Sequence, residues 1–464
     1  MHLARTASRQ RAVAPVSRPA GTIDDASHLN GTAIREIVDV SANDELAVTQ
    51  IRAALDRARA AKVHVSIAGF RHSMGGQTIA ANGIVLNMLG HNRMELRGET
   101  LHVQSGAVWK DVIDYLELHG RSVAVMQSDS PFSVGGSLSV NCHGWQHLHE
   151  PIASTVEALQ VLLPSGEVRH CSRTEEPALF AHVLGGYGLF GVILDAELQT
   201  VPNERYREVH QNCDVASYER LFDETVRDRD GIGMAYGRIS VAPDSFLRAA
   251  ALTYYEREPG PLPPLGAMHH SRLERLVFRG SAGSDYGKNL RWRLENSRLR
   301  RTQHVSRNQL LHQTIDVYLD RGPATSDILH EYFVPRGTLA AFLDRIRPLL
   351  DHRRNIDLLN ITVRDVRQDQ TTALPYARAD VFAVVMFFNQ QRTPEGEAAM
   401  QELTRELIDV TLETGGTYYL PYRLHATSEQ FARAYPDAEE VFDEKRRRDP
   451  DDLFSNAWYS RYGR

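Results

Sequence analysis

The sequence predicts an α+β protein with two domains. Its 464 residues exceed one ordinary domain and fit two or three domains of ~150 residues each. Helix-like and strand-like segments alternate as far as Pro202, and longer candidates follow, including the strand-like runs ILHEYFVP and VFAVVMFF. A composition of 42% hydrophobic and 24% charged residues is that of a globular protein, which excludes disordered, collagen-like and coiled-coil classes.

Charge and cysteine content exclude further classes. The 53 basic and 59 acidic residues give a net charge of −6, so no global positive field favours nucleic-acid binding. Three scattered cysteines and the lack of a CxxC pair indicate a reducing, cytoplasmic setting. Residues 1–22 lack the apolar run of a secretory signal and are expected to be a flexible tail, and no apolar run approaches the ~18 residues of a membrane span. The scarcity of lysine indicates a bacterial genome rich in GC.

The first two hundred residues divide into short elements. Apolar residues at helical spacing behind a polar start predict a helix over 41–62, and Gly120 ends a second helix over 108–119. Pro164-Ser165-Gly166 predicts a hairpin turn, followed by a helix over 175–184 and a strand over 190–201. The other expected strands are 63–67, 83–88, 101–106 and 122–126.

A GxGxxG pattern at residues 186–191 resembles a dinucleotide fingerprint. The element order is reversed, because a helix leads in and a strand leads out. Its backbone amides would therefore not converge on a helix N-terminus, which disfavours a nicotinamide-type Rossmann site.

Five side chains that can bind a metal ion lie within nine residues: Cys142, His143, His147, His149 and Glu150. A zinc site is one interpretation, but the spacing fits no standard site. Neighbouring glycines suit a chain that passes close to a flat ligand, and no metal is expected.

Two glycine-rich loops are the most informative features. IAGFRHSMGGQ (67–77) directly follows a strand candidate, and SDSPFSVGGSLSVNCHG (128–144) follows about fifty residues later. Such loops can offer backbone N–H groups to phosphate oxygens. One loop alone is weak support for such a site, whereas two in one domain favour a bound phosphate-bearing cofactor.

From about residue 23 to the C-terminus, these motifs resemble the vanillyl-alcohol oxidase type of flavoprotein, with its p-cresol methylhydroxylase-type FAD-binding domain. The resemblance implies an FAD-binding domain at 23–203, a substrate cap on an antiparallel sheet at 204–420, and a C-terminal segment at 421–464 that returns to the FAD domain. The closest likeness is to alditol and aldonolactone oxidases and to the decaprenylphosphoryl ribose oxidase group.

The resemblance implies FAD, with His72 at the position where many members attach the flavin covalently. The alternative is that His72 only contacts FAD. Some members have a second, cysteine link, but Pro131 occupies the aligned position, so double attachment is not expected. The implied cofactor-binding residues are Gly69, Phe70, Arg71, His72, Ser73, Met74, Gly75, Gly76, Gln77, Ser128, Val134, Gly135, Gly136, Ser137, Ser139, Asn141, His143, Gly144, Gly186, Gly191, Val192 and Asn456.

Catalytic candidates come from the same resemblance. Tyr422 stands where the decaprenylphosphoryl ribose oxidase group has a lysine needed for activity, and His147 matches a pocket histidine of that group. Arg364 resembles the substrate-side arginine of alditol and gulonolactone oxidases, while Thr362 replaces their glutamate, so polyol specificity is not supported.

An alcohol oxidation needs a proton acceptor and positive charge near the reduced flavin. The expected acceptors are Tyr422, His425 and His147, and the expected cations are Arg364 and Arg423. Either Glu331 or Tyr332 can line the same cavity, because strand alternation sends neighbouring side chains to opposite faces.

Two basic stretches are interpreted as solvent-exposed helix surface. The KRRR run (445–448) is expected to be a solvated helix face, and the arginine-rich stretch 290–307 a solvated cap helix. Contact of residues 290–307 with anionic lipid is the alternative.

The expected function is FAD-dependent oxidation of a CH–OH group on a sugar, polyol, lactone or natural-product alcohol, with O2 or another electron acceptor. One alternative is flavin-dependent C–C or C–N oxidation in secondary metabolism. Another alternative is a flavin- or lipid-binding protein without turnover. The presence of Tyr422 in place of the lysine supports this alternative.

Overall fold

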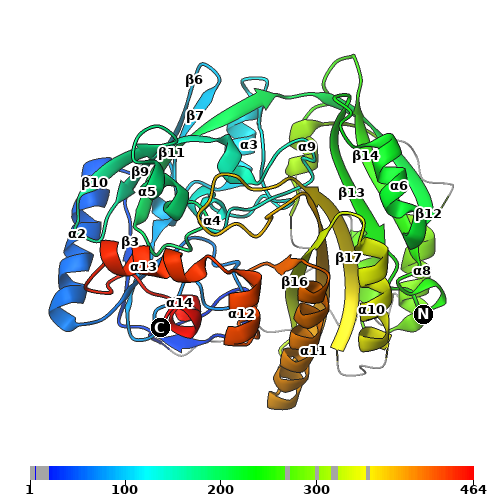
Figure 1. Cartoon of the computed structure of the whole chain (residues 1–464). Coiled ribbons are helices and arrows are strands. Elements are labelled where there is room, and N and C mark those ends of the chain that lie inside the picture. The colour runs from blue at the N-terminus through cyan, green and yellow to red at the C-terminus, as the bar shows by residue number, and fades with distance from the viewer. Residues whose placement is uncertain (1–5, 7–19, 267–271, 298–302, 315–321, 352–355) are drawn as a thin grey trace.

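The computed structural model describes residue 6 and residues 20–266, 272–297, 303–314, 322–351 and 356–464. Most of the expected tail, and residues 298–302 of the arginine-rich stretch, lie outside the described residues. Within those ranges the strands form four sheets accompanied by helices (Figure 1), which confirms the α+β prediction. The division into two domains, with its boundaries, stays a prediction.

A small parallel sheet carries the first glycine-rich loop. Its strand order is β3-β5-β4, with β3 at Glu36–Asp39, β5 at Ile84–Asn87 and β4 at Val65–Ala68. Helix α2 (Asp44–Ala61) connects β3 to β4, as parallel strands require a crossover. The Asn43 side chain accepts a hydrogen bond from the Leu46 N–H and caps this helix.

A second sheet is antiparallel, in the order β10-β9-β11-β7-β6, and β8 pairs with β11. The β9–β10 hairpin turns at residues 163–167, which confirms the predicted turn. The strands of this sheet are β6 Met94–Arg97, β7 Thr100–Gln104, β8 Arg121–Val123, β9 Val156–Leu162, β10 Val168–Ser172 and β11 Val192–Pro202. The helices between these strands are α3 Trp109–Glu117, α4 Val134–Ser139 and α5 Pro177–Val183.

The third sheet has eight antiparallel strands in the order β15-β12-β14-β13-β17-β18-β16-β19. The bounds are β12 Arg205–Asp214, β13 Ile232–Ile239, β14 Ala249–Arg257, β15 His304–Ser306, β16 Thr325–Pro335, β17 Ile356–Val366, β18 Val381–Gln391 and β19 Thr417–Tyr418. Helices α6 (Val215–Thr225), α10 (Leu339–Asp351) and α11 (Pro394–Glu413) pack on one face of this sheet. The other face lines a cavity and is covered in part, since Phe387 of β18 packs against Phe278 and Asn360 of β17 accepts a hydrogen bond from Arg291.

The remaining elements are short. They are β1 Thr22–Ile23, β2 Thr32–Ala33, the 3-10 turns η1 Met88–Gly90, η2 Ile152–Thr155 and η3 Pro243–Ser245, and the helices α7 Arg272–Gly280, α8 Asp285–Glu295, α9 Arg307–Leu311, α12 Ser428–Ala434, α13 Ala438–Arg448 and α14 Ala457–Tyr462. No helix in the described part of the chain is both long and apolar enough to cross a membrane.

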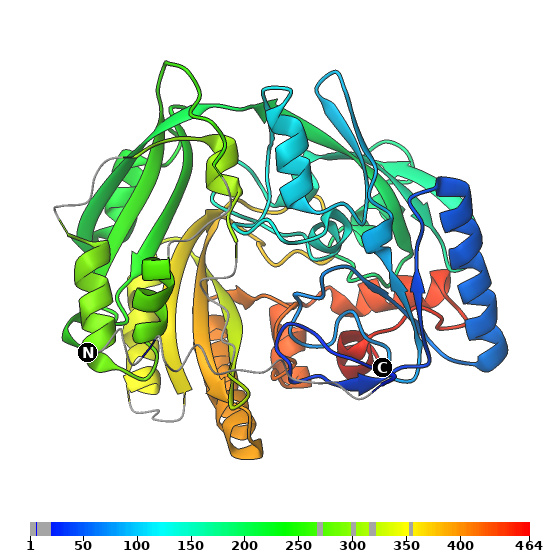
Figure 2. The same cartoon turned by 180° about the vertical axis from the view of Figure 1, so that it is seen from behind.

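The chain returns to its N-terminal part at the end. Both views show α13 and α14 beside the N-terminal sheet and α2 (Figures 1 and 2). Phe454 forms a parallel bridge with Val65 at the start of β4, and the Val65 N–H donates to the Leu453 carbonyl at 2.7 Å. The last residues therefore reach the strand that leads into the first glycine-rich loop.

Two local expectations need correction. The strand expected at 122–126 ends at Val123, because the carbonyls of Val123 and Ala124 accept hydrogen bonds from the Arg307 guanidinium. The KRRR run is not wholly solvated, because Lys445 is fully buried and pairs with Asp449 and Asp452 at 2.8 and 2.6 Å.

Candidate active site

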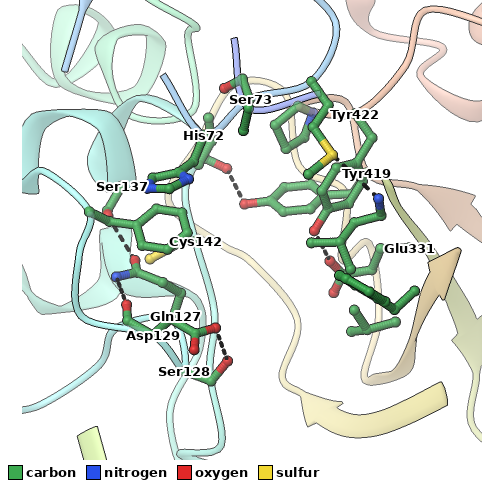
Figure 3. A pocket seen from close by; sticks show the side chains of 18 of the residues that line it. His72, Ser73, Gln127, Ser128, Asp129, Ser137, Cys142, Glu331, Tyr419 and Tyr422 are labelled. Atoms are coloured by element: carbon green, nitrogen blue, oxygen red, sulfur yellow. Dashed lines mark hydrogen bonds between the residues drawn. The ribbon is translucent and has the colours of Figure 1, made fainter. Parts of the chain in front are cut away.

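A cavity of about 360 Å³ lies between the two glycine-rich loops and the face of the eight-stranded sheet opposite α6, α10 and α11. Figure 3 shows His72, Ser137, Cys142 and Gln127 on one side of this space and Glu331, Tyr419 and Tyr422 on the other. The cavity thus joins residues from near the start, the middle and the end of the chain.

The first loop (69–77) leaves the carboxyl end of β4. Gly69 is required there because a Cβ would lie 2.0 Å from the Ser133 Oγ of the second loop. Among the described residues, the backbone N–H groups of Phe70, His72 and Ser73 have no protein acceptor. Unsatisfied amides in a glycine-rich loop form the kind of cradle that holds phosphate oxygens.

The far side of this loop is held by hydrogen bonds. The Gln77 side chain donates through Nε2 to the carbonyls of Leu420 and Tyr422 at 2.7 and 3.0 Å, and its Oε1 accepts the Gly75 N–H at 2.9 Å. The buried Asp25 carboxylate accepts the Gly76 N–H at 2.9 Å. The loop and the segment that carries Tyr422 are therefore fixed to each other.

His72 lies in the wall of the cavity. Its ring is 4.1 Å from that of Phe132 and 5.8 Å from that of Phe70, measured between centroids. Burial lowers the pKa of His72 to about 4, so the imidazole is neutral near pH 7. Its Nε2 lies 2.8 Å from the Pro131 carbonyl, which can only accept, so Nε2 carries the proton and Nδ1 keeps a free lone pair.

The second loop contributes polar groups around α4. The Ser137 hydroxyl accepts from the Trp109 indole at 2.8 Å and donates to the Gln127 side chain at 2.7 Å. Burial raises the pKa of Cys142 to about 12, so its thiol stays protonated. This loop therefore supplies ordered donors and acceptors but no reactive thiolate.

Glu331 on β16 is the central ionisable group of the cavity. Its side chain is buried, with one carboxylate oxygen 2.5 Å from His143 Nε2 and the other accepting the Tyr422 hydroxyl at 3.1 Å. Burial by itself would raise the pKa of Glu331, but His143, Arg364 and the Tyr422 hydrogen bond outweigh burial and lower it. The same burial, together with the Glu331 charge, raises the pKa of Tyr422 well above its usual range.

Arg364 lines the cavity near this pair. Its guanidinium donates to the Ser128 hydroxyl at 3.0 Å and to the His143 carbonyl at 3.5 Å. No described carboxylate forms an ion pair with it at salt-bridge distance, so its charge acts on the cavity and on Glu331.

The predicted cofactor residues fall into two groups. Those that line the cavity are Gly69, Phe70, Arg71, His72, Ser73, Met74, Ser128, Gly136, Ser137 and His143. The remaining ones, outside the lining, are Gly75, Gly76, Gln77, Val134, Gly135, Ser139, Asn141, Gly144, Gly186, Gly191, Val192 and Asn456. Several of the second group support the lining residues, as Gln77 does.

The glycines of the GxGxxG pattern pack tightly against protein. Helix α5 precedes the pattern and β11 follows it, which confirms the reversed order. A Cβ on Gly186 would lie 1.9 Å from the His182 carbonyl, and one on Gly191 would lie 2.6 Å from Val161. Asn456 donates to the Tyr187 carbonyl within this turn at 2.9 Å.

Of the four predicted catalytic residues, the structure brings Tyr422 and Arg364 to the cavity. His147 is fully buried outside its lining, and burial, with Arg367 nearby, lowers the pKa of His147 to about 4. His425 also lies outside the lining, 2.9 Å from the Glu397 carboxylate and 3.0 Å from the Thr404 hydroxyl. Neither histidine is placed to take a proton from a molecule in the cavity.

Sequence reasoning found one feature of the carboxylate site and missed another. Glu331 lines the cavity while Tyr332 faces the opposite side of the sheet, as strand alternation predicted. The His143–Glu331 contact was missed, since it joins residues 188 positions apart. The alternation of β13 and β18 could have marked other lining residues, but only once their cavity face was known.

No group of three metal-ligating side chains occurs in the described ranges, the segment around Cys142 and His147 included. FAD fits the cavity better. Unsatisfied loop amides suit its phosphates, and Phe70 and Phe132 flank His72 where a flat ring system can lie.

Comparisons with known proteins agree with this assignment. Residues 47–172 match a family model described as an FAD binding domain. Cytokinin dehydrogenase 5 of Oryza sativa subsp. japonica is 35% identical over 157 residues, which cover 31% of this chain and 29% of the relative. An uncharacterized oxidoreductase, ORF5 in the fasciation locus of Rhodococcoides fascians, is 30% identical over 214 residues, covering 43% and 47%. Cytokinin dehydrogenase 2 of Arabidopsis thaliana is 33% identical over 137 residues, covering 29% and 27%.

These alignments span less than half the length of each relative. They identify FAD as the cofactor and carry no substrate assignment to this chain. The match begins before the first glycine-rich loop and ends after the second, so both loops lie within it.

Proposed function

We propose that this protein is an FAD-dependent oxidoreductase that oxidises a CH–OH group of a small molecule. Residues 23–203 and 421–464 form its FAD-binding domain, and residues 204–420 form the substrate cap. The observation that carries the proposal is the buried Glu331 carboxylate, which is hydrogen-bonded to Tyr422 and His143 in a cavity shared with the two cofactor loops.

FAD bound in this cavity supplies an acceptor for the hydride of the substrate CH–OH group. The protein must then remove the hydroxyl proton. The Tyr422 oxygen receives that proton while its own proton passes to Glu331, 3.1 Å away. A phenol with a raised pKa stays protonated beforehand, so Tyr422 acts as a relay and Glu331 as the final acceptor.

Arg364 contributes positive charge beside this relay. It lowers the pKa of Glu331 and keeps the carboxylate ionised before reaction. As the only arginine on β17 that lines the cavity, it can also stabilise negative charge that develops on the substrate oxygen. O2 or another electron acceptor completes the cycle.

The relay is tested by anaerobic mixing of the FAD-loaded protein with sugars, polyols and lactones while flavin absorbance is followed. Glu331→Gln keeps the shape of the side chain but removes the acceptor charge, so it should slow flavin bleaching by about 10²- to 10⁴-fold. Glu256→Gln, on the same sheet but outside the cavity lining, is the matched control. Unchanged bleaching by the Glu331→Gln protein would contradict the relay.

His72 is proposed to attach FAD covalently. Its free Nδ1 lone pair makes this nitrogen the point of attachment, because Nε2 is held by Pro131. After acid precipitation, yellow colour should remain with the wild-type protein and leave the His72→Ala variant. Release of flavin from both proteins would retain FAD and reject the covalent link.

A second candidate is flavin-dependent oxidation of a C–N bond. Its support is the similarity to proteins named cytokinin dehydrogenases. The same bleaching assay with amines separates the candidates, since amines that bleach the flavin while every alcohol fails would favour it. Flavin that neither class reduces would favour a binding protein without turnover.

A further inference from the structure

One wall of the cavity is a face of the eight-stranded sheet, and the side chains of this wall change from apolar to polar across the strands. The pairing registers place Arg238 of β13 opposite Thr362 of β17, Thr362 opposite Val385 of β18, and Val385 opposite Glu331 of β16. All four side chains line the cavity. A single row therefore runs from the carboxylate of the reaction site to an arginine on the far side.

The middle of this row is apolar and its far end is polar. Val385 and Phe387 form the middle, whereas Thr362 and Asn360 flank Arg238. Neighbouring strands lie ~4.8 Å apart, so the backbone positions of Glu331 and Arg238 are separated by roughly 14 Å. Both side chains line the cavity, and the distance between them fits a short carbon chain.

Arg238 has more hydrogen-bonding capacity than the protein uses. Within the described ranges its Nη2 donates to the Glu295 carboxylate at 3.0 Å, and its Nε is buried without a described partner. A guanidinium has five N–H donors, and a half-buried one stabilises an anion through charge-assisted, often bidentate bonds.

The ion pair with Glu295 does not account for this placement. Glu295 also accepts from the buried Arg291 at 2.8 Å, so one carboxylate serves two guanidinium groups. Arg364, next but one to Thr362 on β17, adds a second cation without a carboxylate partner in the described chain. The β13–β17 side of the cavity therefore carries surplus positive charge.

We propose that Arg238, with Thr362 and Asn360, forms a subsite for an anionic group of the substrate, either a carboxylate or a phosphate. The inference rests on the proposed oxidation at Glu331 and names its substrate class, a hydroxylated acid or phosphate ester. The hydroxyl-bearing carbon lies at the Glu331 end and the anionic group at the Arg238 end, with the carbon chain across Val385.

Matched pairs of probes that differ in one anionic group test this proposal. D-glucuronate is compared with D-glucose, D-gluconate with D-glucitol, and glucose 6-phosphate with glucose, in anaerobic flavin bleaching. The anionic member of a pair should have at least a tenfold lower KM, which corresponds to one charge-assisted contact. Preference for the carboxylate or for the phosphate pair identifies the source of the anion.

Substitutions test whether Arg238 causes the preference for anionic probes. Arg238→Gln should remove the preference by raising KM for the anionic probe about tenfold with little change in kcat, and Arg238→Lys should restore part of it. Arg207→Gln, an exposed arginine on β12 of the same sheet, should keep the preference. Glu295→Gln removes the competing carboxylate and should lower KM for the anionic probe.

Binding is measured separately from turnover with glutarate, a dicarboxylate without a hydroxyl group. It should perturb the visible flavin spectrum of the wild-type protein and not that of the Arg238→Gln variant. Glutarate binding without reduction by any alcohol would support the subsite and reject the proposed alcohol oxidation. Reduction by neutral alcohols without anion preference, or an absence of glutarate binding, would overturn the subsite.

Discussion

Glu331 can accept a proton only if it is ionised before the substrate arrives. In an apolar interior the carboxylate would be protonated, because burial raises its pKa. His143 at 2.5 Å and the Arg364 charge reverse that effect. The charge state of one carboxylate therefore depends on two residues that come from the second cofactor loop and from β17.

Replacing His143 by asparagine should raise the pKa of Glu331, since the His143 contact that lowers this pKa is lost. Because the acceptor must be ionised, the acidic limb of the pH–rate profile should move to higher pH. The rate of anaerobic flavin bleaching between pH 4 and 8 measures this limb. His170→Asn, which removes an exposed histidine paired with Glu175, should leave it in place. An acidic limb that does not move would mean that Glu331 is not the acceptor.

Helix α13 and the turn after it form one charged unit inside the protein. The Lys445 ammonium is buried with the Asp449 carboxylate, which in turn accepts the N–H groups of Leu453 and Phe454 at 3.0 and 2.8 Å. This turn positions Phe454 against Val65 in β4. A buried ion pair thus fixes the C-terminal segment beside the strand that leads into the flavin loop.

Lys445→Met should lower the free energy of unfolding by about 3 to 5 kcal/mol, because Asp449 would remain buried without its cation. Arg447→Met, on the same helix but exposed, should change it by about 0.5 kcal/mol or less. Urea unfolding at pH 7 followed by tryptophan fluorescence measures both values. Equal stability of the two variants would show that the ion pair contributes little.

At the scale of the whole molecule, several buried or half-buried histidines are neutral. Burial lowers the pKa of His147 and His149 to about 4 and that of His330 to about 3, below their ordinary value of 6.5. Between these values the unfolded chain binds more protons than the folded one, so stability falls as pH falls through this window. Asp195 and Asp365, whose pKa burial raises to about 6, act in the opposite direction.

The histidines with lowered pKa are more numerous than the aspartates with raised pKa, and their pKa shifts are at least as large. The flavin-free protein should therefore lose stability as the pH falls from 6.5 to 4. Urea midpoints at pH 7.5, 6 and 5 measure the loss. His147→Gln removes one proton-binding site from the unfolded chain, so its midpoint should depend less steeply on pH. His102→Gln, at a half-exposed position on β7, is the control. A midpoint independent of pH would contradict neutral burial of these histidines.

The sequence by itself determined the local elements and the cofactor loops. Helix α2, the β9–β10 hairpin and the two glycine-rich loops follow from short-range periodicity and from backbone conformations that few residues adopt. The resemblance of the loops to a flavoprotein family, and not periodicity, implied FAD and the presence of Tyr422 and Arg364 near it. Strand alternation predicted that only one of Glu331 and Tyr332 would line the cavity.

Only the tertiary structure decided which side chains meet. Nothing in the local sequence distinguishes His143, which lies against Glu331, from His147, which is buried four residues later outside the cavity. The row from Arg238 to Glu331 exists because four strands from distant parts of the chain pair in one register. Register depends on long-range packing of a whole sheet, whereas periodicity and turn chemistry act over a few residues.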